Sequence, residues 1–221
     1  FGNMGYIPLY KEHKRGNEMA KYAKIQKNID GKERYSITPQ IPGGYITPEN
    51  LIKIGEVAKK YNGVLKITSG QRILITNLKE EDLKDIWEDL GMEPAVKNQY
   101  SVKNVEICPA NFCKRSKYPT IGIGMKISKN FHGMPLPNRT KIGVAGCRNA
   151  CSSVYSKDIG VLVDIDGKLF VTAGGSAGFY PRMSDIITKG LSEKEAYELV
   201  KNILEYYNEH GQMGEKLGDF I

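Results

Sequence analysis

The order of the expected strands and helices predicts an α+β fold, in which a ferredoxin-like split βαβ subdomain precedes a second α+β subdomain. Two observations support this prediction. Residues 35–105 alternate between strand-like and helix-like patterns, whereas residues 106–221 contain all four cysteines, a hairpin and a long amphipathic helix. We expect residues 1–34 to form a separate N-terminal segment that wraps around the functional site, so the chain has three parts.

The first block has two helices with clear boundaries. Thr47 and Pro48 begin one helix, because Thr is a good N-cap and Pro is favoured at the first helical position. Residues 81–90 form the other helix, which Gly91 ends. The candidate strands are residues 35–38, 64–67 and 72–76, with a last one before residue 105. The resulting order of strand, helix, strand, strand, helix, strand matches the split βαβ motif.

The second block has two equally clear local signals. Asp166-Gly167 predicts a hairpin between residues 161–165 and 168–172, because this dipeptide favours tight hairpin turns. Ser192 and Glu195 form a capping box that begins the last helix. The apolar face of that helix consists of Ala196, Leu199, Val200, Ile203 and Tyr207.

Composition limits the possible partners. No stretch reaches the roughly 18 apolar residues that a membrane-spanning helix needs, and residues 1–6 lack signal-peptide features, so we expect a cytosolic protein with no membrane partner. The formal net charge of +7 favours anionic ligands or acidic proteins. Because the basic residues are spread along the chain and form no long run, we expect no nucleic-acid partner.

The four cysteines form two close pairs, Cys108 with Cys113 and Cys147 with Cys151. A cytosolic chain with so few cysteines favours a metal centre over disulfides. Cys147 and Cys151 stand four residues apart, so a helical turn would project both sulfurs from one face. The spacing alone leaves three possibilities open: a four-thiolate zinc site, an iron–sulfur cluster and buried cysteines without a ligand.

Five segments around these cysteines resemble the sulfite and nitrite reductase family, and they occur in the family's order over about residues 30–221. They are IPGGYITPEN (41–50), TSGQRI (68–73), KNVEICP (103–109), LPNRTKIGVAGC (136–147) and GGSAGFYPR (174–182). The resemblance implies that Cys108, Cys113, Cys147 and Cys151 ligate a 4Fe-4S cluster and that Cys151 also bridges to siroheme iron. The first pair is one residue closer than in the family, a C-x4-C spacing that still reaches two corners of a cluster.

The resemblance also implies a cationic pocket for the substrate anion. The matching positions are Lys103, Arg139, Lys141 and Gln40, the last of which stands where the family has Arg. Alternation along an extended segment would direct Arg139 and Lys141 to one side. Arg34 or Arg15 is a candidate to supply the missing charge.

Siroheme carries eight carboxylates and therefore needs many donors. The resemblance implies that Lys66, Thr68, Gln71 and Asn149 lie near it, while Gly70 replaces a family Arg whose role residues 11–15 would take. From the residues alone, 68–71 is equally well explained as a plain hairpin turn.

The resulting hypothesis is the six-electron reduction of sulfite to sulfide by siroheme and a 4Fe-4S cluster, most like the small, assimilatory-type sulfite reductases. The chain shows no G-x-G-x-x-G nucleotide fingerprint, so electrons should come from an external, ferredoxin-like donor. The alternatives are nitrite reduction at the same centre, a non-catalytic siroheme or iron–sulfur electron carrier, and a zinc-stabilised nucleic-acid binder. A monomer and a homodimer fit equally well.

Overall fold

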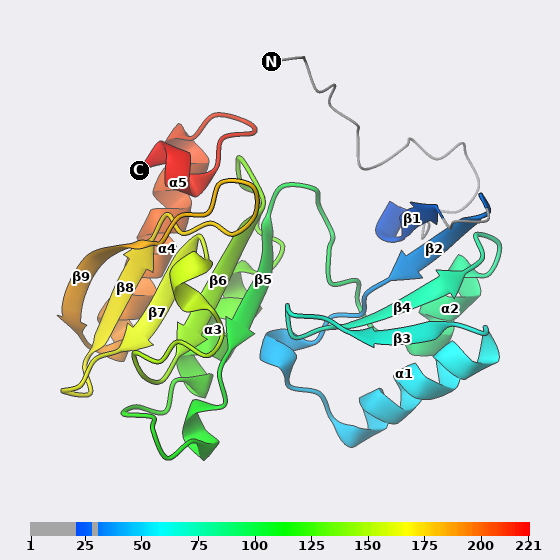
Figure 1. The fold of residues 1–221 in the computed structure, drawn as a ribbon, viewed down its shortest axis with the longest axis horizontal. Helices are drawn as coiled ribbons and strands as arrows, with labels where there is room; N and C mark the ends of the chain where they lie inside the picture. Colours follow the sequence, from blue (N-terminus) through cyan, green and yellow to red (C-terminus); the bar gives the residue numbers. More distant parts are fainter. Residues whose placement is uncertain (1–20, 28–30) are drawn as a thin grey trace. The chain divides into compact units, whose positions relative to one another are not determined.

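The computed structural model describes residues 21–27 and 31–221, which divide into two compact units (Figure 1). The first unit comprises the described residues up to Ile41 together with 46–95, and the second comprises 42–45 together with 96–221. Each unit has its own sheet and its own hydrophobic core. The predicted α+β class is therefore confirmed. Residues 11–15 lie outside the described residues.

The first unit is an antiparallel sheet with two helices. Its strand order is β1-β2-β4-β3, and its helices follow β2 and β4 in the chain. The strands are β1 (Lys24–Lys27), β2 (Glu33–Ile37), β3 (Val64–Ile67) and β4 (Ile73–Leu78), and the helices are α1 (Pro48–Lys60) and α2 (Leu83–Leu90). Apolar residues of β2, β4 and both helices form one core, because strand and helix periodicity each leave one face apolar.

The predicted start of α1 and the predicted end of α2 are confirmed, whereas α2 begins at Leu83, two residues later than predicted. The Thr47 hydroxyl caps α1 by accepting a hydrogen bond from the Asn50 backbone N–H at 3.3 Å. Gly91 ends α2 in the left-handed conformation, with φ of 57°, that glycine adopts at little cost.

The fourth strand of this sheet differs from the prediction. The strand that follows α2, β5 (Val102–Ile107), pairs with β6 in the other sheet, and the fourth position is taken by β1, which precedes β2 in the chain. Val102, Val105 and Ile107 are buried in the core of the second unit. The apolar pattern therefore identified a strand, but a strand pattern does not specify its partner.

The second unit is a mixed five-stranded sheet in the order β5-β6-β7-β8-β9. Strands β5, β6 and β7 are parallel, while β7, β8 and β9 are antiparallel. The remaining strands are β6 (Thr140–Ala145), β7 (Ile159–Val163), β8 (Leu169–Ala173) and β9 (Asp185–Leu191). The predicted hairpin joins β7 to β8, with Gly167 at φ of 81°.

Helices α3 (Ile121–Phe131) and α4 (Glu193–His210) bury their apolar faces against one face of this sheet, and the short α5 (Leu217–Phe220) adds Leu217 to the same core. The predicted capping box begins α4, because the Ser192 hydroxyl accepts from the Glu195 N–H at 3.3 Å while the Glu195 carboxylate accepts from the Ser192 N–H at 2.8 Å. Within the described ranges, no helix is long and apolar enough to cross a membrane.

Residues 42–45, which include η2 (Pro42–Gly44), belong to the second unit, although the residues on either side of this segment belong to the first. The η2 segment contacts β5 and α3. Gly43 has φ of 58°, and a Cβ atom there would lie 2.8 Å from Ile107 Cγ1, so glycine is needed for both backbone shape and space. The Tyr45 hydroxyl then donates to the Cys108 carbonyl at 3.5 Å.

Candidate functional site

The functional residues of the second unit lie on the sheet face opposite α3 and α4. Val105 and Ile107 point into the helix-covered core, so strand alternation directs Asn104 and Glu106 to the opposite face. The apolar cluster that contains Cys108 also includes Val154 of η4 (Val154–Ser156), Leu162 and Phe170. This face of the sheet therefore carries the polar side chains of Asn104 and Glu106 close to Cys108.

Gly146 connects the two cysteine pairs. Its N–H donates to Cys108 Sγ at 3.2 Å, and its carbonyl accepts from the Lys117 N–H at 2.8 Å and from the Ser116 hydroxyl at 3.3 Å. A Cβ atom on Gly146 would lie 2.6 Å from Ala110 Cβ and closer still to the Ser116 oxygen. Only glycine therefore leaves room at position 146 for the turn after Cys108, which contains Ala110, to pack against the residue just before Cys147.

The expected helical turn between Cys147 and Cys151 is wrong. Ala150 and Ser153 have φ of 48° and 53°, values in the left-handed region that interrupt a right-handed helix. The segment instead forms two tight turns, since the Ala150 N–H donates to the Cys147 carbonyl at 3.3 Å and the Ser153 N–H donates to the Ala150 carbonyl at 2.8 Å. Asn149 Nδ2 donates to Cys151 Sγ at 3.0 Å.

The thiols of the two pairs influence one another. Burial raises the pKa of the Cys108 thiol, the Gly146 N–H opposes that rise, and the nearby Cys147 and Cys151 raise the pKa further. Cys113 and Cys151 are exposed. Within the part of the chain that the structure describes, no three Cys, His, Asp or Glu side chains are arranged to hold one metal ion. In a 4Fe-4S cluster each of four thiolates binds a different iron, so the four cysteines on these two joined turns are the number of ligands that one cluster needs.

A small cationic pocket of about 100 Å³ lies in the second unit. Arg139 and Lys141 both line it, in agreement with the alternation expected for them, and Lys103 does not. The remaining lining residues are Ser156, Lys157, Asp158, Ser176, Ala177 and Lys216. Four cationic side chains around one small volume form a site suited to an oxyanion.

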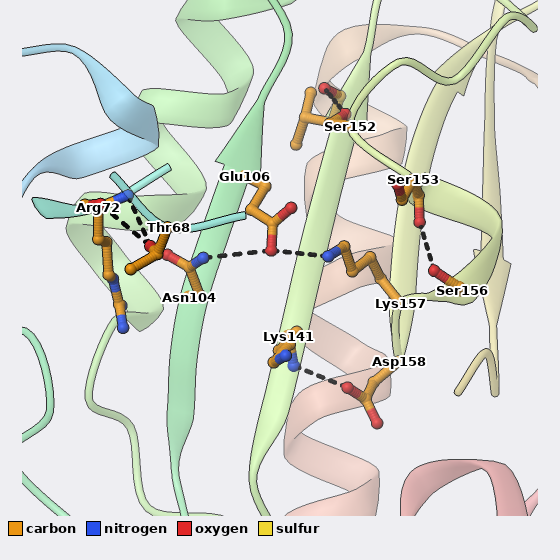
Figure 2. Close-up of polar contacts among 11 residues, drawn as sticks. Thr68, Arg72, Asn104, Glu106, Lys141, Ser152, Ser153, Ser156, Lys157 and Asp158 are labelled. Carbon is orange, nitrogen blue, oxygen red and sulfur yellow. Dashed lines mark hydrogen bonds and ion pairs between the residues drawn. The ribbon is translucent and has the colours of Figure 1, made fainter. Parts of the chain in front are cut away.

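One of these cations already has a buried partner (Figure 2). Lys157 Nζ lies 2.6 Å from Glu106 Oε1, and Asn104 Nδ2 donates to the same oxygen at 3.3 Å. The side chains of the ion pair are only 11% and 4% exposed. Lys157 lies across Gly143, where a Cβ atom would meet Lys157 Cγ at 3.1 Å. The charge that Lys157 brings to the pocket is therefore largely balanced by Glu106.

Among the residues that the structure describes, Asp158 is the one carboxylate that lines the pocket. Its Oδ2 accepts a hydrogen bond from the Lys141 backbone N–H at 2.8 Å (Figure 2), and its carbonyl accepts from the Gly174 N–H at 2.8 Å. Burial raises the pKa of Asp158 to about 6, although backbone N–H groups, Lys141 and Lys216 oppose the rise. Partial burial and Lys157 in turn lower the pKa of Lys141.

Sequence reasoning did not identify Lys157, Asp158 or Lys216 as site residues. Lys157 and Asp158 immediately precede the buried strand β7, and a charged pair at the start of a fully buried strand was the available signal. Lys216 lies far along the chain from the other lining residues and had no comparable signal in the sequence. Its place in the pocket depends on how the segment after α4 folds back.

The candidate siroheme residues of the first unit lie on and beside one hairpin. Lys66 is exposed on β3, and Thr68 and Gln71 form the turn to β4, with Gln71 at φ of 57°. The Thr68 hydroxyl donates to the Arg72 carbonyl at 3.0 Å and accepts from the Arg72 N–H at 3.3 Å (Figure 2), so the predicted turn is confirmed.

Two further residues of this unit concern the expected charge near the substrate. Gln40 keeps its amide oxygen buried, with no hydrogen-bond partner among residues 21–27 and 31–221. Arg34, the candidate replacement on β2, donates to the Glu33 carbonyl at 3.0 Å. Arg15 lies outside the described residues.

Comparison with known families agrees with this arrangement. Residues 26–93 match the nitrite/sulfite reductase ferredoxin-like half domain, and residues 98–221 match the nitrite and sulphite reductase 4Fe-4S domain. The chain therefore belongs to the nitrite and sulfite reductase family, a family of oxidoreductases. Membership implies a 4Fe-4S cluster and siroheme as the cofactors, as expected from the sequence.

Two curated relatives show different extents of overlap. The chain is 30% identical over 192 residues to the assimilatory-type sulfite reductase of Nitratidesulfovibrio vulgaris, covering 86% of this chain and 88% of that protein. It is 32% identical over 188 residues to the nitrite reductase [NAD(P)H] of Bacillus subtilis, covering 84% of this chain but 23% of that protein. The chain thus spans nearly the whole of the first relative and about a quarter of the second.

Solved structures share the fold. Dissimilatory sulfite reductase I superposes with a TM-score of 0.71 at 15% identity, over 85% of this chain and 66% of that one. The NirA protein of Mycobacterium tuberculosis gives a TM-score of 0.73 at 17% identity, over 96% of this chain and 42% of that one. At these identities the likeness concerns the fold alone.

Proposed function

We propose that this chain catalyses the siroheme-dependent reduction of sulfite to sulfide with six electrons from an external donor. The observation that carries the proposal is the pocket in which Arg139, Lys141 and Lys216 converge. The overlap with nearly the full length of an assimilatory-type sulfite reductase supports sulfite as the substrate.

The cofactors would be held by the residues that the sequence predicts for them. Cys108, Cys113, Cys147 and Cys151 would bind the cluster, with the Gly146 N–H and the Asn149 amide stabilising negative charge on two of the sulfurs. Lys66, Thr68, Gln71 and Asn149 would bind siroheme, to which Cys151 would also connect the cluster. When bound, these groups supply the electron transfer and the redox chemistry at iron.

The protein's own residues would bind the anion and manage its protons. Sulfite must take up six electrons and seven protons to yield hydrosulfide and three water molecules, so negative charge and protons both have to be handled close to it. Arg139 and Lys141 would hold the oxyanion and stabilise charge that develops as oxygen leaves, with Lys216 as the third cation of the pocket.

Nitrite is the second candidate substrate. Nitrite reductases are among the relatives, with 32% identity in the Bacillus subtilis protein, and nitrite is also a small oxyanion that a cationic pocket can bind. Sulfite carries more charge than nitrite near neutral pH, so a pocket in which cationic side chains outnumber carboxylates favours sulfite.

Kinetics and metal analysis test the proposal together. We expect about four cluster irons and one siroheme iron per chain, little zinc, and a higher kcat/KM for sulfite than for nitrite with a reduced viologen as donor. A higher kcat/KM for nitrite would reassign the substrate. Loaded protein without turnover of either anion would indicate an electron carrier, and colourless protein with one zinc would end the proposal.

A further inference from the structure

Asp158 has the wrong charge for an oxyanion pocket when it is ionised. It lines the same small volume as Arg139, Lys141 and Lys216, where its negative charge would repel an incoming anion. Its hydrogen bond from the Lys141 N–H fixes the carboxyl beside the residue most directly implicated in anion binding. The pocket therefore contains one carboxyl group whose ionisation would weaken the binding of an anion by the surrounding cations.

The charged and titratable groups facing Asp158 come from several elements. Lys141 lies on β6 and Arg139 just before it, Lys157 precedes Asp158 in the chain, and Lys216 precedes α5. Tyr207 of α4 is also close, because Asp158 helps raise the pKa of its phenol. Tyr207 stays neutral at physiological pH, and its hydroxyl donates to the Glu215 carbonyl at 2.5 Å. Asp158 is thus the group in this set that titrates near neutrality, since burial raises its pKa to about 6.

We propose that Asp158 takes up a proton from water when an oxyanion enters this pocket, so that the pocket binds the anion and stores a proton beside it. The inference rests on the proposed function, which assigns the pocket to the substrate. Its physical basis is linkage: an anion raises the proton affinity of a neighbouring carboxylate, and the protonated carboxyl in turn binds the anion more tightly. Each oxygen that leaves as water needs protons, so a proton held there matches the chemistry of the reaction.

Proton uptake can be measured without turnover. Sulfate is a suitable probe because it remains a dianion from pH 5 to pH 8, whereas sulfite itself titrates in this range. Sulfate would replace chloride at constant ionic strength in an unbuffered solution of the purified protein with its cofactors, and a pH-stat would record the protons taken up. The decisive variant is Asp158→Asn, whose side-chain oxygen can still accept the Lys141 N–H. Asp166→Asn is the matched control, because it removes the same charge from an exposed hairpin turn.

We expect the unchanged protein and Asp166→Asn to take up a fraction of a proton, largest near pH 6 to 7, and Asp158→Asn to take up almost none. Sulfate affinity should fall roughly 10-fold from pH 5.5 to pH 7.5 in the unchanged protein and less than about 2-fold in Asp158→Asn. Equal uptake in Asp158→Asn, or no uptake in the unchanged protein, overturns the inference. Either result leaves the proposed function standing, because that proposal is judged by turnover of sulfite and nitrite.

Discussion

At the scale of single residues, Lys141 and Asp158 form the contact that defines the pocket. The backbone N–H of Lys141 donates to the Asp158 carboxylate, and both residues line the same small volume. The sequence predicted Lys141 and Arg139 from a resemblance and from strand alternation. It did not predict Asp158, because a single Asp before a strand is most often a solvated turn residue and only its burial sets it apart.

Lys141→Asn should lower sulfite turnover by roughly 10- to 1000-fold while leaving iron and siroheme content unchanged, because one preorganised cationic donor is lost. Nitrite turnover should fall less. Steady-state rates with both anions and one artificial donor measure the effect. Lys129→Asn, on the exposed side of α3, is the control and should match the unchanged protein. Unaltered sulfite kinetics in fully loaded Lys141→Asn would remove this residue from the site.

Asp158→Asn should also stabilise the protein, but only above about pH 4, with most of the effect reached by about pH 6. The pKa of Asp158 rises from 3.8 to about 6 on folding, so the folded state binds more protons than the unfolded state between these values and stability falls as pH increases through them. The neutral amide of the variant avoids that loss of stability, which is about 3 kcal/mol at pH 7.5. At pH 3.5 the variant and the unchanged protein should be about equally stable. Thermal unfolding of both proteins at the two pH values measures the difference. An equal effect at both would contradict a raised pKa.

At the scale of elements, the two cysteine turns depend on each other through Gly146. Capping residues and turn dipeptides predicted α1, α2, α4 and the β7–β8 hairpin, because those signals are local. The path from Cys147 to Cys151 was mispredicted for the opposite reason. Ala150 lies between the two cysteines and Ser153 just after them, and both have left-handed backbone. Neither residue is a glycine, so the sequence carries no signal for this conformation.

Gly146→Ala should lower iron content per chain and destabilise the protein by about 1 to 3 kcal/mol, because the added methyl group overlaps Ala110 and Ser116. Iron analysis and urea unfolding measure the two effects. Gly122→Ala is the matched control: a Cβ atom there meets nothing within 4 Å, and alanine favours the α3 helix. Full iron content in Gly146→Ala would show that the contact between the two turns is dispensable.

At the scale of the whole molecule, the net charge of +7 matters for electron supply. Under the proposed function an external donor would reach the protein by diffusion, and a positively charged surface accelerates encounters with an acidic protein. The preference for an acidic donor is a prediction that composition alone allows. The assignment of β5 to the second sheet, in contrast, required the structure, because strand pairing depends on distant parts of the chain.

The rate with an acidic ferredoxin-like donor should therefore fall about 10-fold when salt rises from roughly 50 to 300 mM, because ions screen attraction beyond the Debye length. Second-order rate constants from stopped-flow reduction of the protein measure this. A reduced viologen, which is cationic, should show no such decrease. Parallel salt dependence for the two donors would mean that charge does not guide the encounter.

The segment 42–45 has a consequence for how the family's two modules can be separated or exchanged. Because Gly43 packs against Ile107 and Tyr45 bonds to the Cys108 carbonyl, the cysteine-bearing module includes a piece encoded inside the other one. A gene fragment that starts at residue 96 would encode a module with an uncovered patch beside its first cysteine. Recombination at a single linker would leave the same patch uncovered, so the two modules should be inherited together.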